Sequence, residues 1–143
     1  MRTGKRGKLP HRLSVCVSIF DDQSLFDIAV QGGYLVPRPR LGQVPESMSP
    51  KAAENYFNEL CQRSRDHGGE LLALAIREFF HRDHVRYFPI SSIGFYADPR
   101  VGFDPSDSVN ARVDDGGENR IRGGLRPVNL LESILWIQAP YLE

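Results

Sequence analysis

Two helical runs joined by a Gly-Gly turn constrain the fold more than any other feature. Ser49 suits an N-cap and Pro50 the first helical position. Apolar residues then recur at helical spacing until Asp66-His67-Gly68-Gly69 ends the run, and a second run with a broad apolar face begins at Glu70. The pattern predicts helices over 50–66 and 70–80, packed as neighbours. A DNA-binding helix-turn-helix is the alternative, but the second helix is too apolar for base reading.

The flanking segments predict an α+β domain. Residues 13–20 alternate apolar and small polar side chains at period two, which is typical of a strand. Asp22 can cap a short helix that ends at Gly32-Gly33. Residues 108–128 favour a loose hairpin that turns at Asp114-Asp115-Gly116-Gly117. Asn129 with Glu132 resembles a capping box before a closing helix, with a buried strand over 134–137 as the alternative. The expected order is strand, short helix, helical hairpin, loop-rich β region and C-terminal helix.

Two segments lack periodic apolar faces. Residues 1–12 carry five basic residues and no acid, which predicts a disordered basic tail. Residues 35–49 are rich in proline and predict a stiff extended connector. The remaining 13–143 is long enough for a single domain with one core.

Composition excludes several classes of protein. Of the 143 residues, 18 are basic and 18 acidic, so net charge predicts no general attraction to nucleic acid. Two cysteines make no disulfide framework, and no apolar run reaches the roughly 20 residues of a membrane span. We expect a cytoplasmic protein without a cofactor; the sequence leaves a homo-oligomer open.

The segment around the first predicted helix resembles a known module. Residues 22–31, DQSLFDIAVQ, look like the strand-to-helix opening of LysM-like modules, particularly those in phage tail proteins. In that family the Leu, Ile and Ala of such a run pack under a small two-stranded sheet. The resemblance covers residues 15–31, after which the chain continues with GGYLVPRPRLGQVP in place of a tight turn and second helix. It implies a third hypothesis, a phage tail or other structural assembly component.

The densest cluster of functional side chains is FFHRDHVRYFP, residues 79–89. Cations near a helix C-terminus are stabilised by its partial negative charge, so His81, Arg82, His84 and Arg86 are explained as the end of the second helix. That explanation leaves Tyr87 and Phe88 without a structural role.

An enzyme is the second functional hypothesis. His81 and His84 lie three residues apart and could hold a metal, but zinc needs a third protein ligand, for which His67, Cys61 or Asp98 would have to converge on them. Cys61 paired with a histidine could act as a nucleophile, although its place on the apolar stripe predicts burial. A small metal-dependent or Cys/His hydrolase-like enzyme is the resulting alternative.

Arginines interleaved with aromatic rings carry the first hypothesis. Such side chains can neutralise and stack on single-stranded nucleic acid. The candidate contacts lie in two segments, and we list them here: Arg82, Arg86, Tyr87 and Phe88 in the first, and Arg120, Arg122 and Arg126 in the second. The sequence therefore predicts a non-catalytic binding or interaction protein whose partner is single-stranded nucleic acid or an unknown protein.

Overall fold

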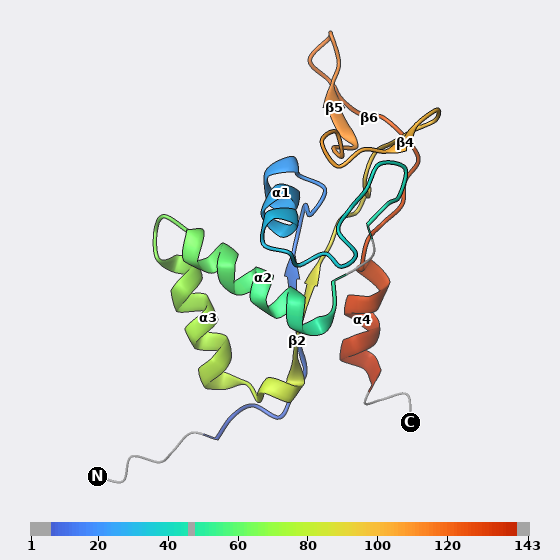
Figure 1. Ribbon diagram of the computed structural model, residues 1–143. Helices are drawn as coiled ribbons and strands as arrows, with labels where there is room; N and C mark the ends of the chain where they lie inside the picture. Colours follow the sequence, from blue (N-terminus) through green and yellow to red (C-terminus); the bar gives the residue numbers. More distant parts are fainter. Residues whose placement is uncertain (1–6, 46–47, 140–143) are drawn as a thin grey trace, which may run out of the picture.

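A parallel pair of short strands lies at the centre of the molecule (Figure 1). Strand β1 (Leu13–Val17) pairs with β2 (Val85–Pro89), with Leu13 opposite Val85. The structure, a computed structural model, describes residues 7–45 and 48–139. Because parallel neighbours need a crossover, the chain passes through α1 (Gln23–Gln31), α2 (Pro50–Arg63) and α3 (Gly68–Phe79) between the two strands. Helix α2 packs on α3 and β2, whereas the C-terminal helix α4 (Leu130–Gln138) packs on β1.

The helical hairpin predicted from the sequence is confirmed. Ser49 caps α2 by accepting a hydrogen bond from the amide of Ala52 at 3.2 Å, and Pro50 occupies the first turn. Helix α3 follows after a short turn and begins at Gly68. The two helices meet at Gly69, where a Cβ atom would lie 2.7 Å from the Cα of Cys61. Glycine therefore permits the close packing of α2 on α3.

The prediction that the histidines and arginines of 81–86 finish the second helix is wrong. Helix α3 ends at Phe79, and Phe80 is already extended, with φ −117° and ψ 149°. A single 3-10 turn, η1 (Arg82–His84), then leads into β2. Pairing with β1 decided this outcome, because residues 85–89 supply the second strand of the central sheet. Tyr87 consequently has a structural role: its ring packs against that of Phe57 with 4.9 Å between centroids.

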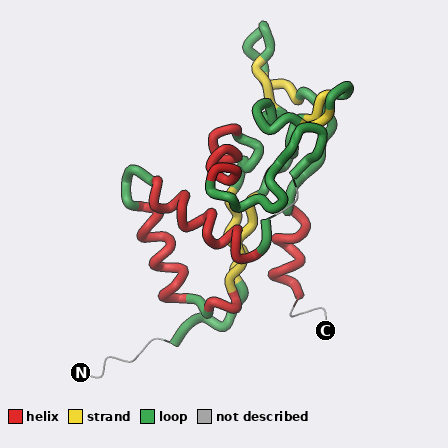
Figure 2. The backbone as a smooth tube through the Cα atoms, in the orientation of Figure 1, coloured by secondary structure: helices red, strands yellow, loops and turns green. Residues whose placement is uncertain are grey.

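The region after β2 is rich in loops, as expected (Figure 2). Strands β3 (Ala97–Asp98) and β4 (Gly102–Phe103) form one small antiparallel pair. Strands β5 (Ala111–Val113) and β6 (Asn119–Ile121) form the predicted hairpin, which lies at the opposite end of Figure 1 from α3. The predicted C-terminal helix is confirmed as α4. The expected capping box is absent, because Asn129 is left-handed at φ 54° and its side-chain amide donates to the carbonyl of Pro89 instead.

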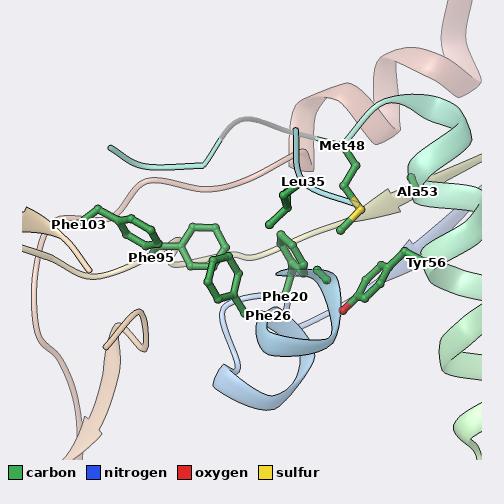
Figure 3. Packing of buried hydrophobic residues seen from close by; sticks show 9 residues of the cluster. Phe20, Phe26, Leu35, Met48, Ala53, Tyr56, Phe95 and Phe103 are labelled. Atoms are coloured by element: carbon green, nitrogen blue, oxygen red, sulfur yellow. The ribbon is translucent and has the colours of Figure 1, made fainter. Parts of the chain in front are cut away.

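Two clusters of buried side chains hold these elements together. The larger joins α1 and α2 to the loops and β4, and Figure 3 shows how its side chains pack. Its members are Phe20, Phe26, Ala29, Leu35, Met48, Ala53, Tyr56, Phe95 and Phe103. Its aromatic pairs meet mostly edge to face, with centroids 5.0–6.1 Å apart, the geometry that ring quadrupoles favour. The smaller cluster, formed by Phe57, Cys61, Ala73 and Ile76, packs α2 and α3 against the sheet.

The N-terminal segment corrects the predicted tail. Residues 1–6 lie outside the described residues, but residues 7–12 run along the body of the protein. The Leu9 amide donates to the carbonyl of Phe79 at 2.7 Å, and the Lys8 ammonium donates to that of Arg77. Residues 7–12 are therefore part of a surface beside α3.

The protein is a small α+β domain with four α-helices and three two-stranded sheets among the residues that the structure describes. None of the described helices is both long enough and apolar enough to cross a lipid bilayer.

Candidate anion-binding groove

A groove with a volume of about 710 Å³ opens between the start of α2, the end of α3 and strand β2. Its walls also include Lys8 from the N-terminal segment and Trp136 from α4. In Figure 1 these contributions come from the lower half of the molecule, where α2 crosses β2. The complete lining is Lys8, Pro50, Lys51, Glu54, Ile76, Arg77, Phe80, Arg82, Asp83, Val85, Arg86, Tyr87 and Trp136. The groove thus combines a charged rim with an apolar and aromatic floor.

Positive charge predominates around this groove. Five of its lining residues are Lys or Arg, and two are Asp or Glu. Glu54 lies between two of the cations, 3.0 Å from Lys51 and 3.3 Å from Arg82. Burial raises the pKa of Glu54, but hydrogen bonds from Lys51 and Arg82 outweigh that effect, so its pKa lies below the ordinary 4.5. A neutral protein therefore carries a local basic concavity, to which an anion is attracted.

Successive residues of β2 serve opposite faces of the sheet. Tyr87 lies against Phe57 of α2, whereas Arg86 stacks over the ring of Trp136 in α4 at 4.5 Å. Arg12 lies over the same indole at 4.2 Å. The period-two alternation of a strand produces this division. Both faces reach the groove because β2 has no neighbouring strand on its second edge in the described part of the chain.

Only part of the predicted nucleic-acid surface comes together. Arg82, Arg86 and Tyr87 line the groove, but Phe88 does not. The second segment lies elsewhere. Arg120 is paired with Asp114 and Glu118, so the hairpin neutralises its charge.

The other two arginines of the second segment are also outside the groove. Arg122 makes two hydrogen bonds with Asp107, at 2.6 and 2.8 Å, and lies 3.7 Å over the ring of Tyr96. Arg126 is exposed on the chain that returns toward α4, where its amide donates to the carbonyl of Ile93. Arg120 and Arg122 are therefore paired with acidic neighbours outside the groove, and the predicted binding surface divides in two.

The predicted metal ligands remain a pair. The rings of His81 and His84 lie 5.5 Å apart, but within 7–45 and 48–139 no group of three or more His, Cys, Asp or Glu side chains is placed to hold an ion. Cys61 is in the core between α2 and α3, where burial raises the pKa of its thiol. His67 is exposed beside Glu70. The structure does not bring these candidates together with the histidine pair.

Ten of the thirteen lining residues were missed by reading the sequence, among them Lys51, Glu54, Arg77 and Trp136. Lys51, Glu54 and Arg77 look like the solvated positions of two amphipathic helices, and Trp136 looks like part of an apolar helix. One weak signal was available: Arg86 stands between the apolar Val85 and the aromatic Tyr87, and a strand there would have divided Arg86 from Tyr87. No local sequence pattern predicted that α2, α3 and α4 would come together around β2.

Comparison with known proteins gave no relative: no family model, no curated protein and no solved structure matches this chain.

Proposed function

We propose that this chain is a non-catalytic binding protein that holds single-stranded nucleic acid in the groove between α2, α3 and β2. The observation that carries the proposal is the groove's composition, five cationic side chains around an aromatic floor in a protein with no net charge. Cations along a groove can track a phosphate backbone, and aromatic surface accommodates bases of any sequence. The site that we propose consists of Lys8, Lys51, Arg77, Arg82 and Arg86 for phosphate, with Phe80, Tyr87 and Trp136 beneath.

The arrangement also supports phosphate contacts on geometric grounds. Arg86 is held by its stacking on Trp136, which orders the guanidinium without neutralising it. The side chain of Arg82 is 74% exposed and pairs with Glu54, which also pairs with Lys51. These two cations and one carboxylate together carry a net charge of +1. Phosphates can therefore approach both arginines without displacing a buried ion pair.

A salt titration tests this proposal. The double variant Arg82→Ala with Arg86→Ala should weaken binding of a short oligothymidine and lower the slope of log K against log salt by about 1.4, because each phosphate contact with a single strand contributes about 0.7. Fluorescence anisotropy at several salt concentrations measures both quantities.

The matched control removes two exposed arginines outside the groove, Arg38→Ala with Arg100→Ala, and should leave the slope unchanged. Thermal unfolding of both double variants shows whether each is folded. An equal slope for folded wild type and the folded groove variant would overturn the proposal.

A further inference from the structure

Strand β2 pairs with β1 along one edge, and its other edge has no neighbouring strand in the described part of the chain. In the parallel ladder with β1, alternate residues of β2 direct both N–H and C=O toward β1. Ile90, just beyond β2, does so: its amide donates to the carbonyl of Val17 at 2.8 Å, and its carbonyl accepts from the amide of Phe20 at 2.9 Å. Arg86 and Phe88 share this parity, so the backbones of Val85, Tyr87 and Pro89 are directed toward the free edge.

Of these three residues, Tyr87 alone offers the free edge both a donor and an acceptor. The amide of Val85 is already bonded to the carbonyl of Arg82 in the turn before the strand. Pro89 has no N–H. Outside the β1–β2 ladder, no hydrogen bond within the described residues uses the Tyr87 amide or carbonyl, and Tyr87 lines the groove. Within the described residues, Tyr87 is therefore the one residue of β2 whose backbone directs both a donor and an acceptor without a partner toward this edge.

A single backbone donor–acceptor pair favours a nucleobase over a peptide strand as the ligand. A peptide strand adds to a sheet edge through a series of alternate residues, each exchanging two hydrogen bonds. Proline at 89 and the occupied amide at 85 interrupt such a series on both sides of Tyr87. A planar group with one donor next to one acceptor needs only the pair at Tyr87. Nucleobases carry such adjacent groups on their Watson–Crick edges.

We infer that the free edge of β2 at Tyr87 hydrogen-bonds the Watson–Crick edge of one unpaired base, while the surrounding cations hold the neighbouring phosphates. The inference rests on the proposed function and adds a basis for selecting single strands. In a duplex the Watson–Crick edges are already paired with each other. The phosphates of a duplex still reach the cations of the groove, but no base edge is available to the Tyr87 backbone. Thymine supplies N3–H to the Tyr87 carbonyl and O4 or O2 to the Tyr87 amide.

Oligonucleotides with identical phosphates test this recognition. Against oligothymidine, an oligomer of N3-methylthymine loses the base donor and adds a methyl group where the Tyr87 carbonyl would lie. An abasic oligomer loses the base altogether. We expect both to bind about 5- to 100-fold more weakly, the range for a bidentate contact, with the salt slope retained.

Amide hydrogen exchange gives a readout from the protein itself. In the free protein the Tyr87 amide should exchange faster than those of Arg86 and Phe88, which bond to β1. Oligothymidine should slow exchange at Tyr87 by at least about 10-fold, and the N3-methylthymine oligomer should not, because only the first completes the pair.

The outcomes separate the two proposals. Equal affinities for the three oligomers, with a steep salt slope and an unprotected Tyr87 amide, would overturn base recognition and leave the groove as a phosphate-binding surface. Failure of every oligomer to bind would overturn the proposed function and base recognition together. An acidic peptide of equal charge that binds more tightly than oligothymidine and protects Tyr87 would also overturn base recognition, in favour of peptide addition to the sheet.

Discussion

Tyr87 packs against the core with its side chain and directs its backbone toward the free edge of β2. The ring packs on Phe57, and burial raises the pKa of the phenol. A strand allows this division because side chains project above and below the sheet while N–H and C=O lie within its plane. Substitution at Tyr87 would disturb packing before it reported on binding, which is why oligonucleotide analogues and amide exchange are the sharper tests of this residue.

Glu54 limits the positive charge of the groove. The variant Glu54→Gln removes the carboxylate that pairs with Lys51 and Arg82, and it retains the shape of the side chain. Because two cations are released toward the ligand, we expect oligothymidine to bind several-fold more tightly at low salt, with the difference shrinking as salt screens the charges. Anisotropy titrations at two salt concentrations measure the effect.

A control on the same helix distinguishes the local effect from a change in net charge. Glu59 pairs with Arg63 and lies outside the groove, so Glu59→Gln should change affinity much less than Glu54→Gln. Equal gains from both variants would show that net charge, and not the groove, governs binding.

At the scale of elements, the β5–β6 hairpin depends on one buried side chain. Asn110 is fully buried immediately before β5. Its amide donates to the carbonyls of Ile93 and Gly124, and its carbonyl accepts from the amide of Gly123 at 3.0 Å. These bonds join both ends of the hairpin to the preceding loop. All six residues of β5 and β6 are exposed, so side-chain packing contributes little to holding this element.

Asn110→Ala should therefore loosen the hairpin selectively. The substitution removes the three hydrogen bonds of the Asn110 side chain, each with a net contribution of about 0.5–1.5 kcal/mol, so we expect a loss of about 2–4 kcal/mol in the free energy of unfolding. Hydrogen exchange over residues 111–121 should accelerate more than exchange over 13–17 and 85–89. Oligothymidine binding should persist, since the hairpin lies outside the groove. Loss of binding in folded Asn110→Ala protein would place the hairpin in the site.

At the scale of the whole molecule, acid should destabilise the fold through many carboxylates. The pKa values of Asp22 and Glu59 lie below their ordinary 3.8 and 4.5, chiefly because each accepts a side-chain hydrogen bond, from Ser24 and Tyr34 respectively. Hydrogen bonds from Arg122 lower the pKa of Asp107 in the same way, and backbone amides lower that of Asp98. Each group binds protons less readily in the folded state than in the unfolded state.

The sign of the pH dependence follows from these lowered values. Their contribution to stability is complete above the ordinary pKa values of 3.8 and 4.5 and is lost as pH falls through the lower folded-state values. The melting temperature should therefore be nearly constant from about pH 5 to 7 and fall steeply below about pH 4. Calorimetry across this range measures it, and a melting temperature that rose on acidification would contradict the assignment.

Local patterns in the sequence determined most elements but not the central sheet. Ser49-Pro50, Asp22 and the Gly-Gly turn act within a few residues of themselves, so α1, α2, the start of α3 and the β5–β6 hairpin could all be predicted. Strand β2 was missed because its partner lies 72 residues away in the chain, as the pairing of Leu13 with Val85 shows. A short mixed segment such as VRYFP becomes a strand only when that partner is present.

By itself the sequence determined the α+β class, the helical hairpin, burial of Cys61 and the presence of Arg82, Arg86 and Tyr87 in one short segment. Tertiary structure alone decided that Arg86 and Tyr87 serve opposite faces, that Arg120 and Arg122 are neutralised by acidic neighbours, and that Lys51 and Trp136 join the groove. The reason is the separation along the chain of the residues that make each feature. Caps, turns and periodicity are properties of adjacent residues, whereas a groove is made by side chains that meet only after a parallel crossover has brought distant elements together.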